Sequence, residues 1–294
     1  MTALSITLPA TFRMGDVLAF HGRDPQGVAE RVTADGLSKG IAWTGQPACL
    51  TLGFGPGAVR AALTIDGAAE PADPLALRAL ASHMLGLDQP IEAFEERYGQ
   101  HPELGRLIAC NRGLRLPLAA SPFEALSWAI TGQQISVGAA VSLRRRLIEA
   151  AGLRHSTGML CCPDADTIAA LGEEGLRACG FSTAKARTLA EASRRVAGGT
   201  LCLDPATPAE ELGRQLLEVP GIGPWTVSYT LLRGFGWLDG SLHGDVAVRR
   251  GLQSLWEAPS RLGEKEVERW LAPFSPWRAL VAAHLWAWQT PRAF

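Results

Sequence analysis

The sequence has 294 residues, enough for one large domain or two domains of medium size. It carries 28 Lys and Arg residues against 29 Asp and Glu residues, a formal net charge of −1. This balance argues against a protein that binds polyanions mainly through its overall charge.

The 6 cysteines contain no Cys-x2-Cys pair, so their spacing does not fit a common zinc or iron–sulfur site. We expect reduced thiols in the core of a cytoplasmic protein. No apolar run reaches the length of a membrane span, and the N-terminus lacks the basic start of a signal peptide. No membrane partner is expected.

The first part of the chain has the pattern of an antiparallel sheet. Apolar and polar residues alternate over residues 48–54 and 59–65, and Gly and Pro separate these segments. A helix is expected near Asp24–Ala34. From Asp73 onward, helix caps and stops recur every 12–20 residues. We therefore predict a mainly α protein, with a small α+β N-terminal domain over residues 1–75 and a helical body over residues 76–294.

A helix start lies at Ser121, which precedes a proline and stands three residues before Glu124. The helix that follows places Phe123, Leu126 and Ile130 on one face. It leads into the segment 131–136, Thr-Gly-Gln-Gln-Ile-Ser, which contains Gln134. A plain turn between two helices is the alternative interpretation of this segment.

The most informative segment is Pro220-Gly221-Ile222-Gly223, which interrupts a helical pattern over residues 212–232 or so. Glycine lacks a Cβ, so the backbone can turn tightly and a phosphate can approach its N–H groups. The second helix begins at Pro224, and its free N–H groups attract an anion. The pattern predicts a helix-hairpin-helix. A glycine turn between two buried helices is the alternative.

Two further features follow the hairpin. Asp245 comes after a glycine-rich loop and opens an apolar and basic run, where a carboxylate ordinarily caps the helix. Trp225 and Tyr229 are four residues apart and share a helix face. A last helical stretch after Pro276 carries Trp286. Aromatic residues at helical spacing ordinarily pack in a core.

Together these motifs resemble the HhH-GPD superfamily of DNA glycosylases, and within it the AlkA-type 3-methyladenine DNA glycosylases. The resemblance extends over nearly the whole chain and implies a two-lobed helical body with a cleft between the lobes. It also implies that Asp245 is the catalytic residue. An anion facing the sugar would stabilise the oxocarbenium charge that develops as the glycosidic bond breaks, and could orient or deprotonate the attacking water.

The resemblance assigns roles to the other motif residues as well. Trp225, Tyr229 and Trp286 match the pocket residues that face the extruded base, and Phe20 is a further candidate for this pocket. Gly221, Gly223 and Thr226 would contact DNA. Gln134 stands where the AlkA-type enzymes have an apolar leucine that wedges into the duplex.

The expected substrate is double-stranded DNA that contains a damaged base. Aromatic faces attract a cationic base by roughly 0.5–2 kcal/mol, which favours alkylated purines such as 3-methyladenine. Family members that form a Schiff base have a lysine where this chain has Trp225, so we expect hydrolysis alone, leaving an abasic site.

No cofactor is expected, apart from a monovalent cation at the hairpin carbonyls, as in related structures. The C-terminal iron–sulfur cluster of some relatives is not expected, because no cysteine follows Cys202. A monomer is the simplest expectation. Two alternatives remain open: a glycosylase for neutral lesions such as uracil, hypoxanthine or etheno-adducts, and a noncatalytic helix-hairpin-helix module that binds DNA.

Overall fold

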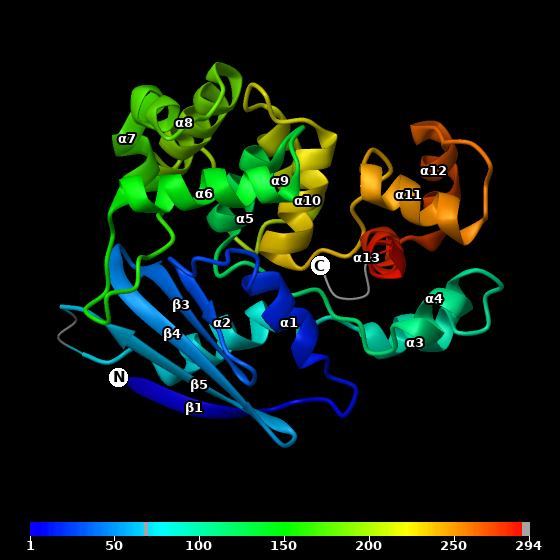
Figure 1. The fold of residues 1–294 in the computed structure, drawn as a ribbon, viewed down its shortest axis with the longest axis horizontal. Helices are drawn as coiled ribbons and strands as arrows, with labels where there is room; N and C mark the ends of the chain where they lie inside the picture. Colours follow the sequence, from blue (N-terminus) through cyan, green and yellow to red (C-terminus); the bar gives the residue numbers. More distant parts are fainter. Residues whose placement is uncertain (68–69, 290–294) are drawn as a thin grey trace.

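The computed structural model describes residues 1–67 and 70–289. Figure 1 shows a small sheet beside a larger helical body. The strands are β1 (Thr2–Thr7), β2 (Glu30–Val32), β3 (Gly36–Trp43), β4 (Gln46–Gly55) and β5 (Ala58–Ile65). The helices are α1 (Met14–His21), α2 (Pro74–Met84), α3 (Ile91–Tyr98), α4 (Leu104–Cys110), α5 (Pro122–Gly132), α6 (Val137–Ala151), α7 (Ala165–Ala178), α8 (Thr183–Ala197), α9 (Ala209–Leu217), α10 (Pro224–Phe235), α11 (Val246–Leu255), α12 (Glu264–Leu271) and α13 (Arg278–Gln289), with a 3-10 turn η1 (Ala272–Phe274).

The predicted antiparallel sheet is confirmed, with the strand order β1-β5-β4-β3-β2. Its inner face carries apolar residues at alternate positions, such as Leu50, Leu52 and Leu63. The apolar face of α2 packs into the same core. The expected domain boundary at residues 75 and 76 therefore falls at the start of a helix that packs on the sheet, and residues 290–294 of the predicted body lie outside the described residues.

The expected helix near Asp24–Ala34 is wrong. The helix of this region is α1, which ends at His21, and the chain then turns and enters β2. Pro25 cannot donate a backbone hydrogen bond, and Gly27 adopts a φ of 59° that a helix does not allow. Pairing of β2 with β3 replaces helical hydrogen bonds in the second half of this segment.

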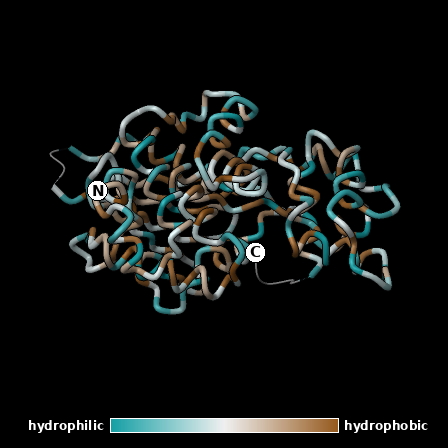
Figure 2. The backbone as a smooth tube through the Cα atoms, turned by 90° about the horizontal axis from the view of Figure 1, so that it is seen from above, coloured by the Kyte–Doolittle hydropathy of each residue, from teal (hydrophilic) through white to brown (hydrophobic). Residues whose placement is uncertain are grey.

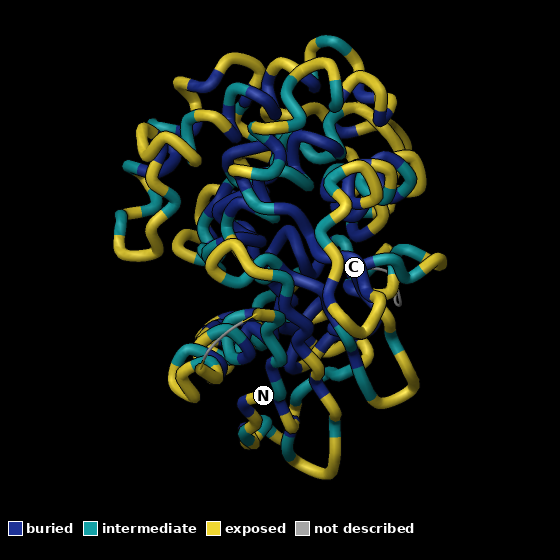
Figure 3. Tube along the Cα trace, turned by 90° about the vertical axis from the view of Figure 1, so that its left-hand side faces the viewer, coloured by how far each residue is buried: buried dark blue, intermediate teal, exposed yellow. Residues whose placement is uncertain are grey.

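The helical body has two apolar cores, and α10 contributes to both. Val227 and Leu231 pack with α5–α9, whereas Tyr229 and Leu232 pack with α3, α4 and α11–α13. These helices therefore form two lobes that meet along α10 (Figure 1). In Figure 2 the hydrophilic segments lie mainly on peripheral loops, and Figure 3 shows the buried residues gathered inside the molecule. No helix of the described residues is long and apolar enough to cross a membrane.

A buried ionic cluster joins the sheet to the helical body. The Lys39 ammonium lies 2.5 Å from Glu30 and 2.6 Å from Glu124, and Arg144 lies 2.7 Å from each of the same carboxylates. Burial would raise the pKa of both carboxyls, but Lys39 and Arg144 hold it below its usual range. Ser121 caps α5 as predicted, because its hydroxyl accepts the backbone N–H of Glu124. The Glu124 carboxylate accepts the backbone N–H of Ala120, one residue before the cap.

The prediction that the cysteines lie in the core is confirmed for four of the six. Cys49, Cys161, Cys162 and Cys179 are buried, whereas Cys110 and Cys202 are exposed, and all are free thiols. The expectation is therefore wrong for the two exposed residues. Cys110 ends α4, and Cys202 lies in the connection before α9, where the chain runs over the surface.

His284 in α13 makes stability depend on pH. It is completely buried, 5.3 Å from the ring of Phe94, and burial lowers its pKa from 6.5 to about 3. Below pH 6.5 the unfolded chain therefore binds a proton that the folded protein excludes. The free energy of unfolding should fall by up to about 1.4 kcal/mol per pH unit as the pH drops towards 3.

The measurement is the urea unfolding midpoint between neutral pH and about pH 5. We expect the midpoint to fall with pH in the native chain and to fall less steeply in His284→Met. Equal slopes in the two proteins would contradict the assignment.

Candidate active site

The predicted helix-hairpin-helix is present as α9, a tight turn and α10. Gly221 has a φ of 90°, and a Cβ on it would lie 2.0 Å from the hydroxyl oxygen of Thr188. That hydroxyl donates a hydrogen bond to the carbonyl of Pro220. Gly223 caps α10 in an extended conformation, and nothing lies within 4 Å of a Cβ placed there. One glycine is required by the turn, and the other keeps the helix N-terminus open to a ligand.

The two glycines therefore differ in their expected response to alanine. Gly221→Ala should lower the free energy of unfolding by about 2–4 kcal/mol, because both the positive φ and the contact with Thr188 oppose a Cβ. Gly223→Ala should change it by less than about 1 kcal/mol. Urea denaturation measures both values. Similar losses in the two variants would show that the turn tolerates a side chain at Gly221.

Asp245 is the N-cap of α11, and its carboxylate also faces two indoles. One oxygen accepts the backbone N–H groups of Ala247 and Val248, at 2.8 and 3.1 Å. The Nε1–H of Trp225 donates to the other oxygen at 2.9 Å, and that of Trp286 donates to the first at 3.2 Å. Asp245 can therefore cap α11 and still face the aromatic residues, because backbone N–H groups and indole N–H groups both donate to its carboxylate.

The three predicted pocket residues are brought together from two distant parts of the chain. Trp225 and Tyr229 stack, with ring centroids 5.2 Å apart at 29°. The ring of Trp286 lies 6.5 Å from that of Tyr229. Tyr229 is buried and the two tryptophans are half-buried, so the three rings form an aromatic cluster beside Asp245 that is partly open to solvent. This cluster, which we call the aromatic cleft, offers ring surface to a flat group next to a fixed carboxylate.

The family model for HhH-GPD superfamily base excision DNA repair proteins matches residues 127–276, which include the hairpin, Asp245 and about half of the chain. The chain belongs to this superfamily.

Similar proteins are known from several organisms. DNA-3-methyladenine glycosylase 2 of Escherichia coli (strain K12) is 32% identical over 195 residues, or 65% of this chain and 67% of that protein. The probable bifunctional transcriptional activator/DNA repair enzyme AlkA of Mycobacterium tuberculosis (strain CDC 1551 / Oshkosh) is 29% identical over 236 residues, 79% of this chain. The match covers only 46% of that longer protein. The solved 3-methyladenine DNA glycosylase from Archaeoglobus fulgidus has the same fold, with a TM-score of 0.80, 97% coverage of both chains and 21% identity.

This HhH-GPD protein has cleft residues that the sequence interpretation did not identify. Trp128 on α5 donates its Nε1–H to the hydroxyl of Tyr229 at 3.0 Å. The guanidinium of Arg233 lies 5.7 Å from the ring of Trp286 and 4.6 Å from that of Phe20. Spacing could have revealed Arg233, which stands four residues after Tyr229 on the same helix. Trp128 had no such signal, because its contact with Tyr229 joins two helices.

Arg233 adds positive charge beside the aromatic residues that the sequence predicted for the pocket. Its side chain is buried and donates to the carbonyl of Pro117 at 2.7 Å. Burial lowers its pKa to about 10, so it keeps its charge at neutral pH.

The two neighbouring glutamines after α5 have different surroundings in this HhH-GPD protein. The Gln133 amide donates to the Gly221 carbonyl and to the Thr226 hydroxyl, both at 3.0 Å. Thr226 is buried, which leaves its backbone N–H in the first turn of α10 as its candidate DNA contact. Gln134 is exposed at the tip of the loop with a φ of 55°. Its role as a wedge stays a prediction.

Among the residues that the structure describes, no group of three His, Cys, Asp or Glu side chains could hold a metal ion. The carbonyls of Pro220 and Gly221 each accept one side-chain hydrogen bond, from Thr188 and Gln133. A carbonyl oxygen has two lone pairs, so both retain one for a cation.

Proposed function

We propose that this protein is a DNA glycosylase that extrudes an alkylated purine from double-stranded DNA and hydrolyses its N-glycosidic bond. The substrate class is cationic purines such as 3-methyladenine, and the product is an abasic site in base excision repair. The observation that carries the proposal is the Asp245 carboxylate, held at a helix N-terminus by the indoles of Trp225 and Trp286. The similarity to DNA-3-methyladenine glycosylase 2 of E. coli supports the same activity.

Asp245 would act on the sugar. Breaking the glycosidic bond leaves oxocarbenium charge on the deoxyribose, and a fixed anion next to it stabilises the transition state more than the ground state. Four N–H donors hold the carboxylate, so little reorganisation is needed as charge develops. The same carboxylate could orient the attacking water.

The hairpin would bind the DNA backbone. The open N-terminus of α10, capped by Gly223, presents free N–H groups to a phosphate. Gln133 ties this hairpin to the α5–α6 loop, so Gln134 would reach the duplex at a fixed position relative to the bound phosphate. Flipping a base costs a few kcal/mol, which insertion of Gln134 and stacking in the cleft would offset.

The enzyme would be monofunctional, because the described cleft offers no amine to form a Schiff base. Trp225 occupies the position of the family's lysine, and an indole is not a nucleophile. Lys39 is buried between carboxylates, Lys185 donates to the carbonyl of Thr131, and Lys265 is exposed on α12. No residue of α12, the helix that carries Lys265, donates a hydrogen bond to Asp245 in the part of the chain that the structure describes.

Two further expectations belong to the same proposal. A monovalent cation would bind the hairpin carbonyls, where Pro220 and Gly221 each keep a free lone pair. The protein would act as a monomer, because one chain supplies the hairpin, Asp245 and the aromatic residues.

The decisive experiment incubates the protein with methylated duplex DNA, identifies the released bases, and tests the strand for breaks before and after alkali. We expect release of 3-methyladenine or 7-methylguanine, with breaks only after alkali. Parallel duplexes that contain hypoxanthine or uracil are included, and release from these alone would favour a glycosylase for neutral lesions. Tight duplex binding without any release would favour a noncatalytic module, and breaks before alkali would contradict monofunctional chemistry.

A further inference from the structure

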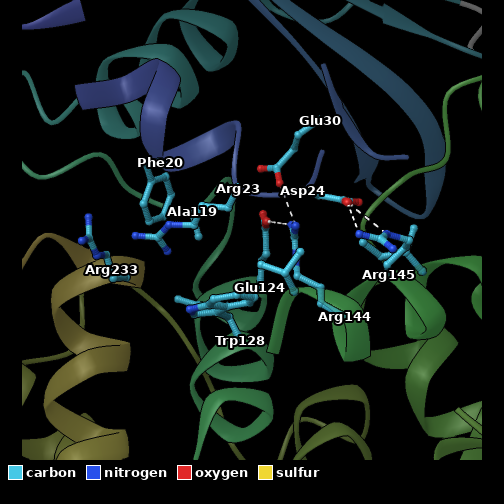
Figure 4. Close-up of a pocket in the computed structure, with 13 residues that line it drawn as sticks. Phe20, Arg23, Asp24, Glu30, Ala119, Glu124, Trp128, Arg144, Arg145 and Arg233 are labelled. Carbon is cyan, nitrogen blue, oxygen red and sulfur yellow. Dashed lines mark hydrogen bonds and ion pairs between the residues drawn. The ribbon is translucent and has the colours of Figure 1, made fainter. Parts of the chain in front are cut away.

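A small cavity lies between the N-terminal domain and α5, α6 and α10 (Figure 4). Its free volume of about 40 Å³ has room for about three water molecules but not for a purine. Two contacts join it to the aromatic cleft. Trp128 in its wall donates to Tyr229, and Arg233 in its wall lies over the ring of Trp286. The cavity therefore lies directly behind the residues proposed to hold the extruded base.

The cavity contains four arginines, and three of them have polar partners. Arg144 pairs with Glu30 and Glu124, Arg145 pairs with Asp24, and Arg233 donates to a backbone carbonyl. These contacts measure 2.5–2.9 Å. Arg23 is half-buried, and within residues 1–67 and 70–289 its guanidinium makes no ion pair or hydrogen bond.

Arg23 contacts two aromatic rings instead. Its guanidinium carbon lies 4.5 Å from the ring centroid of Phe20 and 5.9 Å from that of Trp128. Figure 4 shows the guanidinium between these two side chains. A slot between aromatic rings thus holds a planar, delocalised cation in the free protein.

We propose that Arg23 is a specificity-determining residue that occupies the deep end of the base pocket and competes with a cationic base. The inference rests on the proposed function. An alkylated purine is also flat and carries a delocalised positive charge, so it suits the slot between Phe20 and Trp128. The two cations cannot share that slot, and the Arg23 side chain must withdraw before such a base is fully inserted.

The structure gives Arg23 a way to withdraw. Its neighbour Asp24 is anchored by Arg145, so the backbone stays in place while the long side chain changes rotamer. No ion pair has to break. Withdrawal gives up the cation–π contacts whichever base enters. The withdrawn guanidinium stays close enough to repel a cationic base but not a neutral one, so Arg23 weakens binding of cationic bases more than binding of neutral bases.

The test compares release of 7-methylguanine, which is cationic in DNA, with release of neutral hypoxanthine from duplexes of one sequence. Arg23→Met removes the charge and nearly keeps the length. We expect it to raise the ratio of 7-methylguanine release to hypoxanthine release by about three- to tenfold. Arg23→Lys keeps the charge and should stay within about twofold of the native ratio. An unchanged or lower ratio in Arg23→Met would overturn the proposal.

A binding measurement separates this proposal from the proposed function. Tryptophan fluorescence reports binding of 7-methylguanosine, at mildly acidic pH where the purine is cationic, and of neutral inosine. Arg23→Met should raise the affinity for 7-methylguanosine relative to the affinity for inosine by about three- to tenfold. This shift should appear whether or not the protein releases bases from DNA. If that shift appears but no duplex loses a base, only the glycosylase assignment fails. If release occurs without any shift, only the role of Arg23 fails.

Arg97 provides the matched control. Its guanidinium lies 5.5 Å from the ring of Tyr98 and 5.6 Å from that of Trp277, in the lobe away from the cavity. Arg97→Met removes an arginine with comparable cation–π contacts. It should leave unchanged both the ratio of 7-methylguanine release to hypoxanthine release and the relative affinity for the two nucleosides. A shift equal to that of Arg23→Met would trace the effect to overall charge and overturn the proposal.

Discussion

Asp245→Asn is expected to slow base release by about 10²- to 10³-fold, because it removes the anion that faces the developing positive charge. The substitution should leave α11 intact. Asparagine caps helices as well as aspartate does, and its oxygen can still accept the N–H groups of Ala247 and Val248. The amide nitrogen would face the Nε1–H of Trp225, which loses its acceptor, so the thermal midpoint should fall slightly. The main loss should appear in the rate of base release and not in duplex binding.

Asp164→Asn is the matched control. Asp164 caps α7 and accepts the backbone N–H of Thr167 at 2.9 Å, far along the chain from the cleft residues. Single-turnover release from methylated DNA should be unchanged in this variant. If Asp245→Asn releases base at the native rate, the carboxylate is only a helix cap and another group must stabilise the sugar.

Lys39→Met should lower the free energy of unfolding by about 3–5 kcal/mol. Removing this ammonium leaves Glu30 and Glu124 buried together with only Arg144 to balance them. The uncompensated carboxylate is costly in a medium of low polarity. Because Glu124 also lies in the first turn of α5, the helix that carries Trp128 and Gln133 should be displaced as well, and base release should fall with stability.

The measurement is urea denaturation followed by tryptophan fluorescence. Arg187→Met is the control, because Arg187 pairs with Glu173 at an exposed site, where such pairs contribute about 1 kcal/mol or less. The double variant Lys39→Met with Glu30→Gln restores the charge balance and should recover part of the loss. A single variant as stable as the native chain would show that the cluster does not hold the two parts together.

Local signals in the sequence were reliable where one segment carried the whole signal. The capping serine and the proline after it predicted the start of α5, and the strand alternation predicted β4 and β5. The expected helix near Asp24–Ala34 failed because β2 is only three residues long and is stabilised by pairing with β3. The two strands form a hairpin across the turn at residues 33–35, and the spacing of apolar residues does not report this backbone pairing.

The sequence by itself determined the hairpin, the capping position of Asp245 and the shared face of Trp225 and Tyr229. Each depends on backbone constraints or helical periodicity within a few residues. Only the tertiary structure decided that the indole of Trp286 reaches Asp245, that Trp128 binds Tyr229, and that Arg23 lies in a slot between two rings. Apart from the contact of Arg23 with Phe20, these contacts join residues far apart in the chain, and the packing of helices and domains brings them together.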